Sequence, residues 1–278
     1  MKRLAKYAAL LLALSLPQAA LARGVASACP DAAAGRVVPA ALSLPGRTAA
    51  ADSAMSAGDR TSPVSRKLIV IGFMGGHIKA DNLAHREARL ARDLRDLYPA
   101  RVHTAVFANH NGRGALEAVL RLLDRDGNGC LSAGEKETAR IVIYGHSWGA
   151  SETVALARRL NRLNIPVLLT IQVDSVQKSN ENDGVIPPNV REAVNFYQQD
   201  GLLHGRSLIA ARDPSRTKIL GNFESSYRGH PVSCAGFPWY ARAFMRSHIE
   251  IENDPQVWNR IEALIAAKIA EPGRPETQ

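Results

Sequence analysis

Cysteine is scarce in this 278-residue chain, and the three that occur, Cys29, Cys130 and Cys234, form no Cys-x-x-Cys pair. That spacing excludes the usual dithiol redox centre and the common cysteine-based zinc site. In an oxidising compartment, three cysteines allow one disulfide and one free thiol, or pairing between chains. The sequence does not choose between these pairings.

Long apolar runs are absent after the N-terminal segment. Three basic residues precede an apolar stretch at 8–16, and Ala20-Leu21-Ala22 supplies the small residues that a signal peptidase reads. The stretch is too short to span a membrane as a stable helix. We expect an export signal over residues 1–22, with an uncleaved anchor as the alternative. The mature chain is then periplasmic or extracellular and has no transmembrane segment.

Positive charge is abundant but not concentrated in one part of the chain. The formal net charge is +9, to which Lys2, Arg3 and Lys6 of the expected signal contribute three charges. A nucleic-acid-binding surface needs a basic stripe with interleaved aromatic residues. Aromatic residues make up only 5% of the chain and do not alternate with basic ones. We therefore expect no nucleic-acid partner, while the oligomeric state stays open.

The pattern of elements predicts one α/β domain after a weakly patterned leader. Residues 23–66 are rich in Ala, Gly, Ser and Pro, which is typical of a flexible segment. From residue 67 to 278, strands and helices alternate, so we expect a mostly parallel sheet with helices on both faces. The expected strands are 67–71, 102–108, 140–144, 167–173, 194–197 and 218–223, and the expected helices are 82–98, 114–123, 149–163 and one beginning at Pro255 behind the cap Asp254.

A sharp turn between one strand and the next helix carries the most informative motif. The apolar strand 140–144 is followed by Gly145-His146-Ser147-Trp148-Gly149 and then by a helical segment. Glycine at both flanking positions is required because larger side chains would collide where the strand and helix cross. Such a turn exposes the Ser147 hydroxyl above the edge of the sheet.

This arrangement resembles the nucleophile elbow of the α/β-hydrolase superfamily over about residues 67–270, as in exported esterases and lipases. The resemblance implies a three-layer α/β-hydrolase fold in which 67–71 is the family's third strand and 140–144 its fifth. The first two strands of the family are then missing or lie within the leader. The resemblance also implies that Ser147 is a catalytic nucleophile.

The family's chain order places an acid between the serine and the histidine. Asp174 directly ends the strand 167–173, a position similar to that of the acid in pancreatic-type lipases. Asp183 and Asp200 are the alternatives, since many relatives take the acid from a later strand. We expect Asp174 to orient the catalytic base.

The family's histidine precedes the final helix. His248 lies six residues before Asp254, whereas His230 lies much further upstream. We therefore expect His248 to be the general base, with His230 as the alternative. His146, inside the turn, is expected to point away from the serine hydroxyl.

Two backbone N–H groups are expected to form an oxyanion hole. One belongs to Trp148, directly after the serine, and the other to the glycine-containing loop 72–76, where Phe73 is the expected donor and Met74 the alternative. Shortly before His248, the segment 223–245 holds six aromatic residues. These aromatic side chains either line a substrate pocket or pack in the core.

A second motif predicts a calcium site. The segment 124–135 matches the EF-hand loop, with Gly129 at the sharp turn and a bidentate acid at the last position. The expected ligands are Asp124, Asp126, Asn128, the Cys130 carbonyl, Ser132 and Glu135. The loop precedes the strand whose far end carries Ser147, so Ca²⁺ is expected to be a structural ion and no cofactor is expected for catalysis.

Together these features predict an exported serine hydrolase that cleaves a carboxylic ester of a small molecule, a lipid or a polymer through an acyl-enzyme. A thioesterase, an acyltransferase or a peptidase would use the same residues. A calcium-dependent binding protein that kept the fold without catalysis is the alternative from another class. Acyl and alcohol specificity is not encoded in any motif that we recognise.

Overall fold

We describe a computed structural model of the chain, which covers residues 67–179 and 181–272. The expected signal at 1–22 and leader at 23–66 lie outside the described residues. Within the described part, no helix has the length and apolar character needed to cross a membrane.

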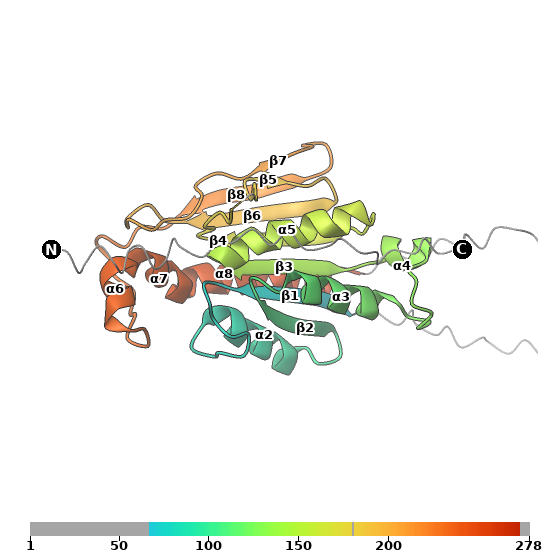
Figure 1. The fold of residues 1–278 in the computed structure, drawn as a ribbon, viewed down its shortest axis with the longest axis horizontal. Coiled ribbons are helices and arrows are strands. Elements are labelled where there is room, and N and C mark those ends of the chain that lie inside the picture. The colour runs from blue at the N-terminus through green and yellow to red at the C-terminus, as the bar shows by residue number, and fades with distance from the viewer. Residues whose placement is uncertain (1–66, 180, 273–278) are drawn as a thin grey trace, which may run out of the picture.

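A six-stranded parallel sheet forms the centre of the domain (Figure 1). Its strands run in the order β2-β1-β3-β4-β6-β8. Their bounds are β1 Leu68–Met74, β2 Val102–Ala108, β3 Ile141–His146, β4 Val167–Val173, β6 Val190–Tyr197 and β8 Lys218–Glu224. Two further strands, β5 (Val185–Ile186) and β7 (Ala210–Ala211), pair only with each other.

Helices cover both faces of the sheet, and each face has its own apolar core. The helices are α2 Arg86–Leu97, α3 Gly112–Leu123, α4 Ala133–Glu137, α5 Trp148–Arg162, α6 Trp239–Phe244, α7 Arg246–Asn253 and α8 Pro255–Ala270. α2 and α8 pack on one face, and α3 and α5 pack on the other. The predicted three-layer α/β fold class is therefore confirmed.

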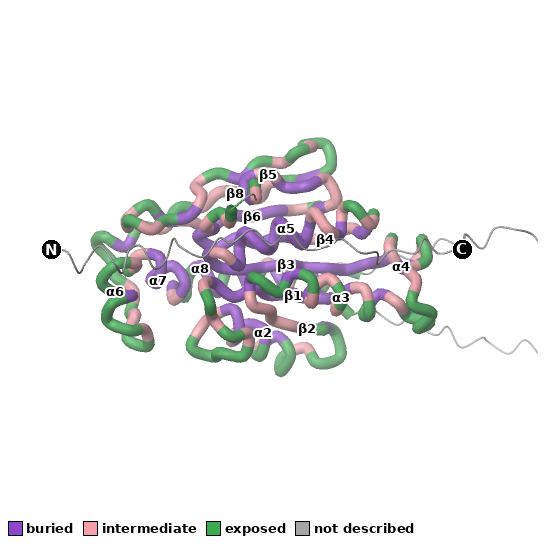
Figure 2. Tube along the Cα trace, viewed as in Figure 1, coloured by how far each residue is buried: buried purple, intermediate pink, exposed green. Residues whose placement is uncertain are grey.

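β1 illustrates why these residues form a central strand. Leu68 and Val70 contact the α2 and α8 side, whereas Ile69, Ile71 and Phe73 contact the α3 and α5 side. Apolar residues at both odd and even positions are what a strand buried on both faces requires. The whole of β3 is buried in the same way, as the continuous purple tube in Figure 2 shows.

Some element boundaries differ from the expected ones. α2 begins at Arg86 and not at residue 82, because residues 80–84 form turns and His85 takes the N-cap position. β6 begins at Val190, four residues earlier than expected, because the polar Glu192 also pairs with β4 and β8. α6 and α7 were not expected; they lie between β8 and α8. The predicted start of α8 is confirmed, with the Asp254 carboxylate accepting a hydrogen bond from Gln256 N.

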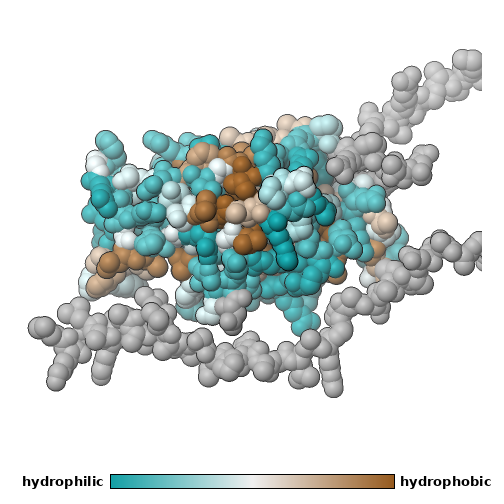
Figure 3. Space-filling view, turned by 90° about the horizontal axis from the view of Figure 1, so that it is seen from above, coloured by the Kyte–Doolittle hydropathy of each residue, from teal (hydrophilic) through white to brown (hydrophobic). Residues whose placement is uncertain are grey.

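The surface is mostly hydrophilic on the side that lies uppermost in Figure 1, with a small hydrophobic patch at its centre (Figure 3). On α6, Trp239, Tyr240 and Phe244 are exposed, with Trp239 72% accessible. These three aromatic residues therefore do not pack in the core. Tyr227 is buried and does belong to it.

Candidate active site

Ser147 lies at the sharp turn between β3 and α5, in a conformation that only a tightly constrained serine adopts. Its φ is 57° and its ψ is −126°. A Cβ on Gly145 would lie 2.5 Å from the Gly149 backbone, and one on Gly149 would lie 2.2 Å from the Phe73 carbonyl oxygen. Both flanking glycines are therefore sterically required, as the sequence motif predicted. The turn stores backbone strain of the kind found at functional sites.

Three polar side chains from distant segments meet above this turn. His248 Nε2 lies 2.9 Å from Ser147 Oγ, and His248 Nδ1 lies 2.6 Å from Asp174 Oδ2. The accessible fractions of the three residues are 8% for Ser147, 5% for His248 and 0% for Asp174. With Nδ1 donating to the carboxylate, Nε2 is free to accept the serine proton.

The Asp174 carboxylate accepts hydrogen bonds from other donors in addition to His248. Oδ1 accepts hydrogen bonds from Gly205 N (2.7 Å) and Gln198 N (3.2 Å), and Oδ2 accepts one from Gln198 Nε2 (2.8 Å). A Cβ on Gly205 would lie 2.2 Å from the Asp174 backbone, so only glycine permits this approach. Gln198 and Gly205 were not predicted from the sequence, because no local motif relates them to Asp174.

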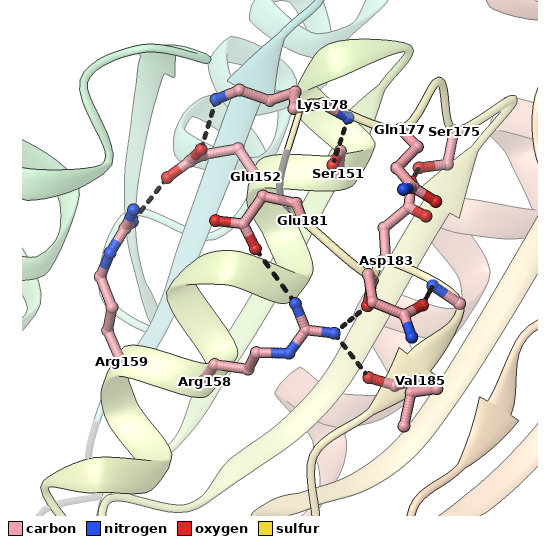
Figure 4. A network of polar contacts seen from close by, with 12 residues as sticks. Ser151, Glu152, Arg158, Arg159, Ser175, Gln177, Lys178, Glu181, Asp183 and Val185 are labelled. Atoms are coloured by element: carbon pink, nitrogen blue, oxygen red, sulfur yellow. Dashed lines mark hydrogen bonds and ion pairs between the residues drawn. The ribbon is translucent and has the colours of Figure 1, made fainter. Parts of the chain in front are cut away.

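The alternative acids bind elsewhere. Asp183 accepts hydrogen bonds from Ser175 Oγ (2.6 Å) and Arg206 Nε (2.7 Å). Figure 4 shows Asp183 together with a second set of ion pairs, in which Lys178 and Arg159 bind the buried Glu152 of α5 from two sides. These contacts make Asp183 part of a structural network.

Asp200 and His230 are likewise not in contact with the serine. Asp200 accepts hydrogen bonds from Ser226, from the Tyr227 amide and from Arg228. Burial acts to raise the pKa of Asp200, but these donors outweigh it and the pKa is lowered. His230 is an exposed loop residue.

His146 lies directly beside His248. Their ring centroids are 4.5 Å apart, and His146 Nε2 donates to the His248 carbonyl oxygen at 3.2 Å. Burial, followed by the nearby His248 and His85, holds the pKa of His146 well below its usual value. The His146 ring is therefore neutral. The expectation that it points away from the serine hydroxyl agrees with these contacts.

Behind His146 lies a buried group of carboxylates that no sequence motif indicated. Glu252 Oε1 accepts from His85 Nδ1 at 2.6 Å, and Glu87 Oε1 accepts from Gly75 N at 3.2 Å. Burial, followed by the charge of Glu252, raises the pKa of Glu87 well above its usual value. In the sequence, the only local indication of this group is the presence of polar residues at the start of α2. Polar residues are common at the start of any helix, so they did not indicate a site.

The expected oxyanion donors lie at the ends of two elements. Trp148 is the first residue of α5, and Phe73 lies in β1 opposite Gly145 with its side chain fully buried. Of the loop glycines, Gly75 approaches the serine most closely: a Cβ on it would lie 3.2 Å from Ser147 Cβ. The assignment of Trp148 and Phe73, with Met74 as the alternative, stays a prediction.

Shallow cavities flank the serine, and no described cavity encloses it. One of about 520 Å³ follows the oxyanion loop and is lined by His77, Ile78, Lys79, Asp81, Asn82 and Leu83. Another of about 350 Å³ is lined by residues 175–177, 199 and 204–207. The His77 ring packs edge-on against Trp148, with centroids 5.5 Å apart, which connects the larger cavity to the turn.

The expected calcium loop joins α3 to α4. Asp124, Asp126 and Glu135 each offer a carboxylate oxygen, and these oxygens lie within 4.8 Å of one another. Asp124 Oδ1 is buried without a hydrogen-bond partner. Gly127 and Gly129 have φ of 67° and 78°, which permits the tight turn. This geometry fits a small cation.

Glu135 is already held by the loop. Its Oε1 accepts from Arg125 N at 2.7 Å, and its Oε2 accepts from Ser132 N and Ser132 Oγ. Burial acts to raise the pKa of Glu135, but these hydrogen bonds outweigh it and the pKa is lowered. The carboxylate is thus kept ionised, as a cation ligand must be.

Of the cysteines expected from the sequence, Cys234 is a free thiol.

Comparison with known proteins yields distant likenesses. No family model and no curated protein matches the chain. RedJ, a thioesterase of the prodiginine pathway in Streptomyces coelicolor, is 8% identical over 76% of this chain and 96% of its own, with a TM-score of 0.38. A cutinase-like protein from Cryptococcus sp. is 13% identical over 76% and 99%, with a TM-score of 0.38. Human thioesterase 2 is 11% identical over 73% and 96%, with a TM-score of 0.35. We therefore base the function on the geometry of this chain.

Proposed function

We propose that the chain is an exported serine hydrolase that cleaves carboxylic esters through Ser147, His248 and Asp174. The observation that carries this proposal is the unbroken hydrogen-bond path from Ser147 Oγ through the His248 ring to Asp174. A serine hydroxyl is a weak nucleophile unless a positioned base takes its proton. The strained turn presents the hydroxyl to that base. Export is supported by the N-terminal residues described above.

In the proposed reaction, Ser147 Oγ attacks the ester carbonyl carbon while its proton passes to His248 Nε2. The carbonyl π bond opens, and its oxygen becomes an oxyanion stabilised by the N–H groups of Trp148 and Phe73. Collapse of this intermediate breaks the bond to the alcohol, which takes the proton from His248. Water then attacks the acyl-enzyme by the same sequence and releases the acid and free Ser147.

Four other functions share parts of this geometry. A thioesterase or an acyltransferase uses the same three residues and differs only in the leaving group or the acceptor. A peptidase would be recognised by activity on peptide bonds. A non-catalytic binding protein is disfavoured because such a protein has no need for a histidine 2.9 Å from a strained serine.

Turnover of p-nitrophenyl esters of increasing chain length tests the proposal. We expect hydrolysis by the purified chain and, for Ser147→Ala, a loss of turnover on the order of 10⁴-fold with an unchanged melting temperature. Thioester and peptide substrates measured in parallel separate the alternatives. Equal turnover by the wild type and Ser147→Ala would contradict the proposal.

We also propose that the loop 124–135 binds a structural Ca²⁺. Support comes from its three clustered carboxylates and from the buried, unpartnered Asp124 Oδ1. α4 lies at the opposite end of β3 from α7, which carries His248 (Figure 1). The six residues of β3, at about 3.3 Å each, separate the loop from Ser147 by about 20 Å. The ion is therefore too distant to take part in the chemistry.

A further inference from the structure

A buried cluster of histidine and glutamate side chains joins the start of α2 to α7. His85 takes the N-cap position of α2, Glu87 lies in its first turn, and Glu252 lies on α7, the helix that carries His248. One nitrogen or oxygen atom from each of these three residues lies within 4.8 Å of the other two. We propose that His85, Glu87 and Glu252, with His146 as the fourth ligand, bind one zinc ion.

Burial and charge support a cation at this place. Glu87 is 0% accessible and Glu252 is 3% accessible. Among the described residues, neither carboxylate forms an ion pair with a lysine or an arginine, and their ion-pair partners are histidines. Arg89 is the nearby cation whose charge acts on both carboxylates, but it contacts neither directly. Two buried carboxylates without a cation are costly. A divalent ion with two neutral imidazoles and two carboxylates forms a site of zero net charge.

An unpartnered atom points to the same conclusion. Glu87 Oε1 accepts from Gly75 N, but Glu87 Oε2 is buried and has no hydrogen-bond partner. Buried polar atoms are almost always paired, so an orphan carboxylate oxygen beside a histidine and a second carboxylate requires a partner. A metal ion provides one.

The tautomer of His146 supplies an independent reason. Its Nε2 lies 3.2 Å from the His248 carbonyl oxygen, which can only accept, so Nε2 carries the proton. Nδ1 is then the ring atom that is available as a metal ligand. This atom faces Glu252 Oε2 at 3.6 Å and Glu87 Oε1 at 4.0 Å, which are also acceptors. Without a proton or a cation between them, the lone pairs of these three acceptor atoms repel one another. A zinc ion placed between the three atoms would accept those lone pairs as ligands.

The geometry and the donor types favour zinc over calcium or magnesium. Imidazole nitrogen suits Zn²⁺, whereas Ca²⁺ and Mg²⁺ take oxygen ligands. Tetrahedral zinc with bonds of about 2.0–2.2 Å requires its ligand atoms about 3.3 Å apart. Three of the six ligand pairs are 2.6, 3.6 and 4.0 Å apart, and the atoms that His85, Glu87 and Glu252 offer all lie within 4.8 Å of one another. On binding, zinc would replace the proton through which His85 Nδ1 donates to Glu252 Oε1. The His146 Nε2 hydrogen bond to a carbonyl is the usual second contact of a zinc-bound histidine.

Such an ion would position the catalytic machinery without entering the chemistry. Through Glu252 it would fix α7 and hence His248, and through Glu87 and Gly75 it would fix the oxyanion loop. The proposal does not depend on Ser147 being the nucleophile, because it concerns metal binding by other residues. Ser147→Ala is therefore expected to retain the zinc.

Metal analysis of the purified chain tests the proposal, with Ca²⁺ kept saturating throughout. We expect about one zinc per chain, removal by a strong chelator, and a higher melting temperature when Zn²⁺ is restored. Glu252→Gln and His85→Ala should each weaken zinc affinity by at least about 100-fold. This loss exceeds the one expected when a residue that only hydrogen-bonds to a metal ligand is replaced. Glu250→Gln, on the same helix but paired with Arg246, is the matched control and should bind normally.

Two outcomes would overturn the zinc site. In the first, the purified wild type contains no zinc, and neither its melting temperature nor its spectrum changes when Zn²⁺ or Co²⁺ is added. The histidine and glutamate side chains of the cluster would then share a proton and not a metal ion. The other is unchanged zinc affinity in Glu252→Gln. If that variant does not fold, Glu87→Gln and the visible absorption of the Co²⁺-loaded wild type, which reports coordination without reference to activity, decide the matter.

Discussion

Ser147, His248 and Asp174 depend on one another, and each has a distinct physical task. The serine is presented by a turn with φ of 57°, the histidine connects it to the acid, and the acid is fixed by Gln198 and Gly205. A side chain held by this many contacts cannot move without disturbing its neighbours. Energetic coupling between the three is therefore expected to be strong.

That coupling gives a prediction at the residue scale. His248→Ala and Asp174→Asn should each lower kcat by roughly 10³–10⁴-fold, because the base or its correct tautomer is lost. Adding either change to Ser147→Ala should lower kcat little further, and steady-state kinetics of the double variants measures this. His230→Ala, at an exposed loop position, is the control and should retain full activity. An inactive His230→Ala with an active His248→Ala would reverse the assignment of the base.

At the scale of elements, the loop after β6 joins the site to the rest of the domain. Gln198 and Gly205 from this loop hold Asp174, while Asp200 from the same loop binds residues 226–228 beyond β8. The segment beyond β8 leads to α6 and α7, which carries His248. Asp174 and His248 are therefore connected through one loop.

Asp200 gives a pH-dependent prediction for this loop. Its pKa is lowered in the folded state, so it stabilises the fold above its unfolded pKa, and this contribution disappears as the pH falls through the folded value. Asp200→Asn should lower the free energy of unfolding by about 1 kcal/mol at neutral pH. Urea titrations should show this difference begin to shrink below about pH 4, near the unfolded pKa, and vanish once the pH is below the folded pKa. A difference that stays constant down to pH 2, or one matched by the exposed Asp96→Asn, would contradict this role.

The calcium loop gives the second prediction at this scale. Three carboxylates in one loop repel unless a cation neutralises them, so Ca²⁺ should stabilise the fold by about 2.7 kcal/mol at a hundredfold excess over its dissociation constant. Chelation selective for Ca²⁺ should lower the melting temperature, and added Ca²⁺ should restore it. Glu135→Gln should abolish this response, whereas the exposed Glu137→Gln on the same helix should not. A melting curve unaffected by the chelator would argue against the ion, and a reversible loss of turnover far below the melting range would argue against a purely structural role.

For the whole molecule, the sequence predicts most of the features that arise from consecutive residues, such as buried strands and the sharp turn. The apolar runs of β1, β3 and β4 predict buried parallel strands, and the sharp turn and strand ends predict that Ser147 and Asp174 lie at one edge of the sheet. The pairing of His248 with these residues was predictable only through chain order in the resembled family. Its catalytic role stays a prediction.

Features made by tertiary contacts were not predictable. α6 and α7 have six and eight residues, too few for helix propensity alone to define them. Gln198 and Gly205 reach Asp174 across 24 and 31 residues, and His85 reaches Glu252 across 167. No spacing rule along the chain links such residues. The two-residue strands β5 and β7 are likewise too short to leave a periodic signal.

The central claim is that Ser147 is a covalent nucleophile activated by its position in the fold, and fluorophosphonate labelling tests it most directly. The probe should attach once per folded chain, and peptide mass spectrometry should find the adduct on Ser147. Ser147→Ala should remain unlabelled, and His248→Ala should label at least about 10³-fold more slowly because the base is missing. Labelling of folded Ser147→Ala at the wild-type rate, or an adduct on another residue, would contradict the account.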